Sequence, residues 1–168
     1  MQMLALWIAQ GFWIGRIPIA PGTFGSALGL VWFALLLCTN NLWLYLLGTV
    51  VGFGASVWLS GIAEKMLGKK DPSSVVIDEI TAVPVCFLGW IGRFWVSYHA
   101  LPVPESFFAP ATWYLTLIIF VLFRLFDVAK PWPIRSSQSL AGGWGITVDD
   151  FLAAAYVLVL SLILLWLF

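Results

Sequence analysis

Charged residues occur almost only in three short polar segments of this chain, and apolar stretches separate the segments. The chain has eight Lys or Arg and eight Asp or Glu residues, and all but Arg93 and Glu105 lie in these segments. We call the segments the polar islands; they span residues 16–26, 64–79 and 124–150. Because a charge near lipid costs free energy, acids and bases gathered in this way indicate a site.

The composition predicts one integral membrane domain covering residues 1–168. Of these residues 62% are hydrophobic and 10% are charged, whereas a soluble domain has about 25% charged residues. Eleven Trp and thirteen Phe residues suit a protein whose rings lie along acyl chains and at both membrane interfaces. The formal net charge is zero, which argues against a nucleic-acid partner.

The apolar stretches predict an all-α membrane bundle of about five apolar helices, some of them short. Residues 3–14 are too few to span a bilayer and predict an N-terminal interfacial helix. Two of the five stretches, at 80–91 and 113–126, are marginal against the roughly twenty residues that a crossing needs. The five stretches are residues 24–38, 42–62, 80–91, 113–126 and 151–168.

If every stretch crosses the membrane, all three polar islands lie on one face. Thr39, Asn40 and Asn41 form a short uncharged turn, so the first two stretches are predicted to form a helical hairpin. The islands contain most of the basic residues, and the positive-inside rule therefore makes their face cytoplasmic.

The first island has two interpretations. Gly22 and Gly25 allow close approach of a ligand to the backbone, and Thr23 and Ser26 offer hydroxyl donors at the start of a helix. The N–H groups and dipole of a helix start can bind a phosphate. The alternative is a capped helix start with proline in the entry turn.

The acids of the other islands are predicted to lie at helix ends. Asp78 and Glu79 begin an apolar helix, where the helix dipole alone would favour them. Residues 142–150 are predicted to form a flexible loop that leads into the last helix. Asp149 is then a candidate N-cap, and capping does not require the second carboxylate, that of Asp150.

The third island has the strongest pattern. Arg124, Asp127 and Lys130 are spaced i, i+3 and i+6, so they share roughly one helix face. Pro131 is predicted to end that helix and to leave Lys130 at its C-terminal end.

These residue types together predict phosphoryl chemistry. Carboxylate oxygens without His or Cys clusters suit Mg²⁺ before Ca²⁺ or Mn²⁺. Bases next to such a metal can neutralise a phosphate, and Arg can do so with two parallel hydrogen bonds. The predicted metal ligands are Asp78, Glu79, Asp127, Asp149 and Asp150.

Four stretches of this sequence resemble the phosphatidylglycerophosphatase A family. They are PGTFGS at 21–26, VIDE at 76–79, FRLFDVAKPWPI at 123–134 and GGWGITVDD at 142–150. The resemblance implies a helical enzyme of the bacterial inner membrane that hydrolyses the terminal phosphate of phosphatidylglycerophosphate with Mg²⁺. Ala82 replaces a glycine common in the family, and Asp71 lacks the usual nearby His and receives no role.

Under this hypothesis the residues divide into a catalytic group and a phosphate-binding group. Whether water or an Asp attacks the phosphorus is left open. The catalytic residues are Asp127, Lys130, Arg124 and Asp150. The phosphate-binding residues are Thr23, Ser26, Gly22, Gly25, Arg124, Lys130 and Arg135.

An alternative class is a small membrane cation transporter or channel subunit that uses the clustered carboxylates. Such a protein is expected to place its acids in mid-span, whereas these acids lie at predicted helix ends beside bases. The expected partner is a phospholipid substrate in the membrane, and no obligate protein partner is expected.

Overall fold

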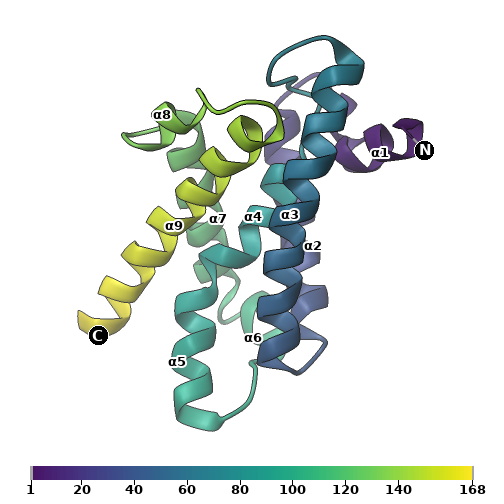
Figure 1. The fold of residues 1–168 in the computed structure, drawn as a ribbon. Helices are drawn as coiled ribbons and strands as arrows, with labels where there is room; N and C mark the ends of the chain where they lie inside the picture. The colour runs from purple at the N-terminus through teal and green to yellow at the C-terminus, as the bar shows by residue number, and fades with distance from the viewer. Residues whose placement is uncertain (1, 168) are drawn as a thin grey trace.

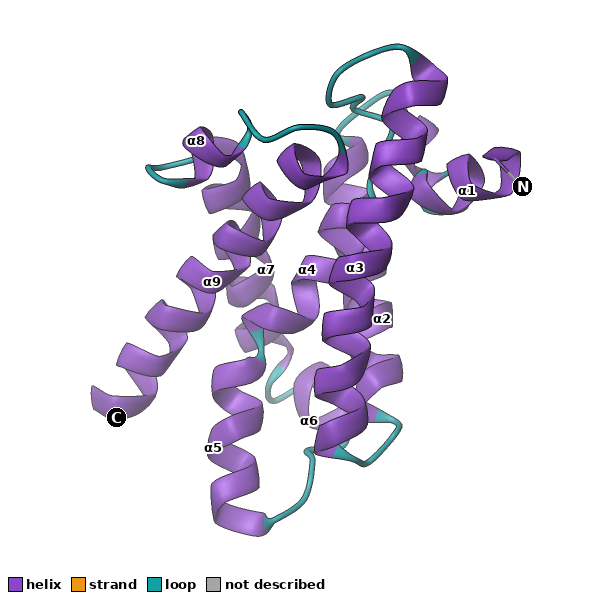
Figure 2. Ribbon diagram, in the orientation of Figure 1, coloured by secondary structure: helices purple, strands orange, loops and turns teal. Residues whose placement is uncertain are grey.

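The apolar stretches become helices, and the polar turns between them separate the helices. A computed structural model describes residues 2–167; this range is helical with no strand, which confirms the all-α prediction (Figure 2). The elements are α1 (Gln2–Ala9), the 3₁₀ helix η1 (Ile14–Arg16), α2 (Pro21–Leu37), α3 (Leu42–Leu67), α4 (Ile77–Cys86), α5 (Leu88–Tyr98), α6 (Glu105–Phe108), α7 (Trp113–Ala129), α8 (Ile134–Ser137) and α9 (Gly143–Leu167).

The described residues include three helical stretches that are long and apolar enough to cross a membrane. They are Leu42–Leu67, Ile77–Tyr98 and Gly143–Trp166, and α2 is a shorter apolar helix. The prediction that the segment at 80–91 is short was wrong, because α5 continues past Arg93. Arg93 lies in the middle of α5 and is exposed, and a long basic side chain can extend its charge toward the membrane interface.

The predicted hairpin between the first two apolar helices is present. Asn41 caps α3, and its Oδ1 accepts hydrogen bonds from the backbone N–H groups of Trp43 at 2.9 Å and Leu44 at 3.2 Å. At its other end, α3 continues to Leu67 and ends at Gly68, which has a φ of +61°.

The bend between α4 and α5 is fixed by aromatic side chains. Pro84 lies inside α4 and supplies no N–H group, so the helix ends shortly after it. Tyr45 of α3 is fully buried and donates a hydrogen bond from its hydroxyl to the Pro84 carbonyl at 2.7 Å. Phe33 of α2 stacks on Phe87 at the bend, with ring centroids 4.0 Å apart. This cluster holds α2, α3 and α4 together in the middle of the bundle.

The three polar islands meet at one end of the bundle. Figure 1 shows α3 ending there, α4 and α9 starting there, and α8 lying at the same end. The short helix α1 also lies near this end and packs against α3. Its Ala9 carbonyl accepts a hydrogen bond from the Val76 N–H at 2.9 Å, just before α4 begins. The predicted interfacial position of α1 remains a prediction.

The predicted loop at 142–150 was wrong, because α9 already begins at Gly143. Asp149 therefore lies two turns inside the helix and is not its N-cap. The glycines that suggest a loop instead permit close packing. A Cβ atom on Gly143 would overlap the carbonyl oxygen of Val57 in α3. Tertiary packing outweighs the low helix propensity of glycine here.

Replacing Gly143 tests this close contact. Gly143→Ala is expected to destabilise the protein by about 1–3 kcal/mol, because the added methyl group must push α9 away from α3. Thermal unfolding in detergent measures the effect. Gly54→Ala is the matched control on α3, since a Cβ there meets nothing within 4 Å. Equal stability of the two variants would contradict the close-packing explanation.

Candidate active site

Three carboxylates from two helices form a cluster at the polar end of the bundle. Asp78 and Glu79 lie in the first turn of α4, and Asp150 lies two turns into α9. Each offers an oxygen atom, and these atoms all lie within 4.8 Å of one another. Asp78 is 6% exposed and Asp150 is 3% exposed. Buried carboxylates this close together require a cation or protons.

Glu79 has an oxygen that nothing in the described part of the chain satisfies. Its Oε2 is buried and has no hydrogen-bond partner. A buried acceptor without a partner costs free energy, and a metal ion ligated by the cluster would satisfy it. The three carboxylates therefore fit the hard-cation site that the sequence predicts.

Arg124 of α7 connects three helices through one guanidinium group. Its Nη1 lies 2.7 Å from Asp127 Oδ2 on the same helix and 3.7 Å from Glu79 Oε1 on α4. The same atom donates a hydrogen bond to Ser26 Oγ on α2 at 3.3 Å. Arg124 thus lies between the carboxylate cluster and the start of α2.

Lys130 is the second base and follows α7 directly. It has a φ of +44°, a left-handed conformation that costs a non-glycine residue roughly 1 kcal/mol or more. Its Nζ lies 3.6 Å from Asp127 Oδ1 and donates a short hydrogen bond to Asp149 Oδ2. Burial lowers the pKa of Lys130, but this hydrogen bond and the nearby carboxylates raise it above its ordinary value overall. The ammonium group therefore remains protonated at neutral pH.

The structure brings Arg124, Asp127 and Lys130 of the third island together, as their spacing predicts. Arg124 and Lys130 both contact Asp127, one carboxylate oxygen each. Asp127 and Asp149 therefore pair most closely with the bases, whereas Asp78, Glu79 and Asp150 form the carboxylate cluster, in which Glu79 also contacts Arg124 at 3.7 Å. Whether all five ligate a metal remains a prediction.

The first island contributes a close backbone approach and a hydroxyl group. A Cβ atom on Gly22 would overlap Glu79 Oε1, so a larger residue there would displace this carboxylate from its observed position. Ser26 Oγ donates to the Gly22 carbonyl at 2.8 Å and also accepts from Arg124. Gly25 lies against Val76, and a Cβ there would come within 2.7 Å of the valine Cβ. Thr23 is half-buried and has no side-chain hydrogen bond within residues 2–167.

The structure does not bring Arg135 into the centre. Arg135 lies on α8, is exposed, and forms no ion pair with any described residue. Conversely, Gln138 was not among the predicted site residues, yet its Nε2 donates a hydrogen bond to Asp149 Oδ2 at 3.1 Å. No spacing rule identifies this glutamine, because it follows α8 in an irregular connection.

Gln138 also lines a polar pocket next to the centre. The pocket has a volume of about 280 Å³, and its charged members are Glu64, Lys70 and Asp71. Asp71, which received no role in the sequence analysis, therefore lies near the site.

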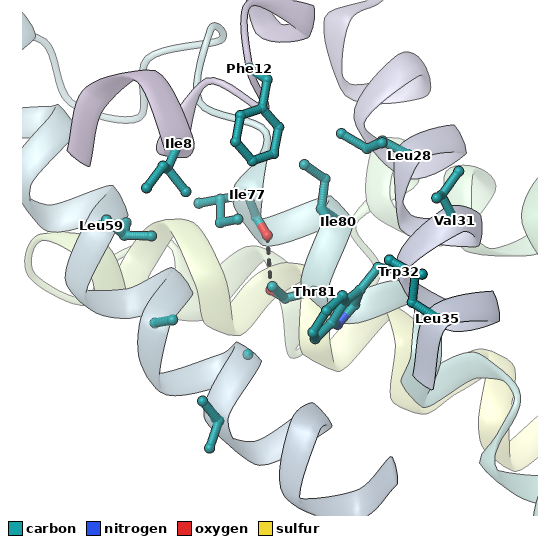
Figure 3. Close-up of a pocket in the computed structure, with 13 residues that line it drawn as sticks. Ile8, Phe12, Leu28, Val31, Trp32, Leu35, Leu59, Ile77, Ile80 and Thr81 are labelled. Atoms are coloured by element: carbon teal, nitrogen blue, oxygen red, sulfur yellow. Dashed lines mark hydrogen bonds between the residues drawn. The ribbon is translucent and has the colours of Figure 1, made fainter. Parts of the chain in front are cut away.

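An apolar groove of about 320 Å³ lies on the other side of α4. Figure 3 shows Ile77, Ile80 and Thr81 of α4 facing Trp32 and its neighbours on α2. At 100° per residue, Asp78 and Glu79 point away from this groove. The groove is thus separate from the carboxylate cluster.

The fold and site define a helical membrane protein whose carboxylates and bases are those of metal-assisted phosphoryl-transfer enzymes. Residues 7–165 match the family model described as phosphatidylglycerophosphatase A. The chain belongs to this family and is a lipid phosphatase.

Curated relatives support the assignment. Phosphatidylglycerophosphatase A of Escherichia coli (strain K12) is 35% identical over 87% of this chain and 74% of its own length. The Haemophilus influenzae protein of the same name is 33% identical over 90% and 83%. A putative phosphatidylinositol-3-phosphatase of Bacteroides thetaiotaomicron is 33% identical over 98% and 96%. No solved structure matches the chain significantly.

Gly22→Ala tests the contact between α2 and the carboxylate cluster. The methyl group is expected to displace Glu79 and to lower phosphatase activity on the order of a hundredfold, as small misplacements of catalytic groups do. Phosphate release from a lipid phosphate monoester measures the loss. Gly92→Ala is the control, since a Cβ there meets nothing within 4 Å. Full activity in Gly22→Ala would show that Glu79 need not occupy its observed position.

Proposed function

We propose that this protein hydrolyses the terminal phosphate monoester of phosphatidylglycerophosphate to phosphatidylglycerol and phosphate, with Mg²⁺ as cofactor. The observation that carries the proposal is the buried cluster of Asp78, Glu79 and Asp150 beside Arg124 and Lys130. The names of the Escherichia coli and Haemophilus influenzae relatives support this substrate.

Asp78, Glu79 and Asp150 would hold the metal ion. Their oxygens are close enough to share one cation, and the unpartnered Glu79 Oε2 gives it a further ligand. All-oxygen ligation favours Mg²⁺. When bound, Mg²⁺ supplies positive charge to the phosphoryl oxygens and increases the acidity of water.

Arg124 and Lys130 would bind the phosphate. Asp127 lies between them and contacts both, so it fixes where the two positive groups point. Gln138 and Asp149 fix Lys130 from the other side. Bases held in place before the substrate arrives stabilise the developing charge without reorganisation during the reaction.

The reaction breaks the bond between the phosphorus and the terminal glycerol oxygen. With water as nucleophile, its oxygen forms the new bond to phosphorus, and a carboxylate of the cluster accepts its proton. The glycerol oxygen takes up a proton as it leaves. Asp127 and Asp150 are the candidates for these proton transfers, because Asp127 contacts both bases and Asp150 lies next to Asp127.

The basic residues at the polar end of the bundle support an orientation and a location for the protein. The polar end of the bundle would face the cytoplasm, in the inner membrane of a bacterium, because it contains most of the basic residues. The lipid substrate is then the only partner that the reaction requires. This enzymatic function is favoured over a cation transporter because the acids lie beside phosphate-binding bases at helix ends.

The decisive measurement is phosphate release by purified protein from phosphatidylglycerophosphate, with Mg²⁺ or with EDTA. Release is expected only with Mg²⁺. Phosphatidylinositol 3-phosphate is tested in parallel, because one relative is named for that substrate class. Well-folded protein that releases phosphate from neither lipid would refute the proposal.

Two aspartate variants separate the metal site from the phosphate site. Asp150→Asn is expected to raise the Mg²⁺ concentration for half-maximal activity by more than about tenfold, because it removes a ligand. Asp127→Asn is expected to lower kcat and to leave the Mg²⁺ requirement unchanged, because it releases Arg124 and Lys130. A raised Mg²⁺ requirement in Asp127→Asn would instead make Asp127 a metal ligand, as the sequence predicts.

A further inference from the structure

We propose that a groove between α7 and α9 binds an acyl chain of the lipid substrate. This inference rests on the proposed lipid phosphatase function and adds a binding site for the hydrocarbon part of the substrate. The groove has a volume of about 370 Å³. It is lined by Phe126 of α7 and by six residues of α9, namely Leu152, Ala155, Tyr156, Val159, Leu160 and Ile163.

The groove begins one helical turn from two residues of the carboxylate and base centre. Phe126 lies one turn before Lys130, and Leu152 lies one turn after Asp149. The hydrogen-bonded pair of Lys130 and Asp149 therefore marks the polar end of the groove. Below this pair, the lining is apolar.

Lys130 is also the most accessible charged group of the centre. Its side chain is 25% exposed, against 18% for Arg124 and 3% for Asp149. A phosphate therefore approaches the centre beside Lys130. A lipid whose phosphate lies there has the α7–α9 groove directly beneath it for one of its chains.

The groove has the length of one leaflet. The eleven residue-to-residue steps from Leu152 to Ile163 rise by about 16 Å along α9. A single leaflet of the hydrocarbon core is about 15 Å thick. A chain that starts at the polar end can thus remain in the groove through most of the leaflet.

Two aromatic side chains, Tyr156 and Phe126, are held in place at the polar end of the groove. The Tyr156 hydroxyl donates a hydrogen bond to the Trp132 carbonyl at 2.7 Å, in the connection that follows Lys130. The Tyr156 ring lies 5.3 Å from the Phe126 ring, centroid to centroid. Because its hydroxyl is engaged, Tyr156 presents its ring to the groove. The two rings form a preformed apolar contact below the phosphate position.

The apolar groove in Figure 3 is a poorer position for the substrate chain. It is lined by Ile77, Ile80 and Thr81 of α4, which point away from Asp78 and Glu79. A lipid chain in that groove would be separated from the catalytic carboxylates by α4 itself.

Acyl-chain length tests the proposal. Val159→Phe fills the groove about 10 Å below Leu152, and we compare hydrolysis of phosphatidylglycerophosphate with two oleoyl chains and with two hexanoyl chains. Lost contact with a few methylene groups is expected to lower kcat/KM for the long-chain lipid by about tenfold or more. The kcat/KM for the short-chain lipid is expected to stay near the wild-type value.

Val121→Phe is the control, because Val121 lies on an exposed face of α7 outside the groove. It is expected to change neither rate. A Val159→Phe protein that hydrolyses both lipids as wild type does, or loses both equally, would overturn the groove assignment. Wild-type protein that hydrolyses neither lipid would instead refute the proposed function.

A second measurement needs no variant. Wild-type protein is photolabelled in EDTA with phosphatidylglycerophosphate that has a diazirine near the end of one acyl chain. The expected result is labelling of residues 152–163. Excess unlabelled phosphatidylglycerophosphate should suppress this labelling, and excess phosphatidylcholine should not. Equal suppression by both lipids would show ordinary surrounding lipid and would overturn the proposal.

Discussion

A carboxylate buried in an apolar bundle is stable only beside a positive charge, a metal ion or a proton, and this requirement determines how α4, α7 and α9 meet. Arg124 satisfies acids on α4 and α7 at once and also contacts α2. Lys130 does the same for α7 and α9. Removing one member of such a pair typically costs about 3–5 kcal/mol, because its partner remains buried and charged. The proposed catalytic centre is therefore also a polar connection between α2, α4, α7 and α9.

The acids of the centre outnumber its bases, and the excess negative charge lies on one side of the centre. The five carboxylates face two bases, which contact Asp127 and Asp149 most closely. Negative charge is left in excess on the side of Asp78, Glu79 and Asp150. A divalent cation on that side would offset the excess, and a phosphate between the cation and the bases would then meet positive charge from two directions. The division of acids into two groups thus matches the two halves of a metal-assisted phosphatase site.

Local sequence patterns predicted the helices and the acids and bases, but not their partners. The i, i+3, i+6 spacing of Arg124, Asp127 and Lys130 predicted a shared face because the interaction is local. The start of α9 was mispredicted because Gly143 is fixed by contact with α3, which no local pattern contains. The same holds for Gly22 against Glu79 and for Gln138 against Asp149. Arg135 was expected at the site from its neighbours in sequence, yet the turns after Lys130 place it on the exposed face of α8.

The depth of the acids also determines how a lipid must enter. Asp150 lies seven residues beyond the start of α9, about 10 Å along the helix, whereas Lys130 lies beyond the end of α7. Charges at the depth of Asp150 are tolerated because protein, and not lipid, surrounds them. A phosphate cannot cross hydrocarbon to reach them, so it must descend from the polar end past Lys130. The hydrocarbon chains of the same molecule have to stay in the bilayer, and an apolar path beside Lys130 lets one substrate satisfy both requirements.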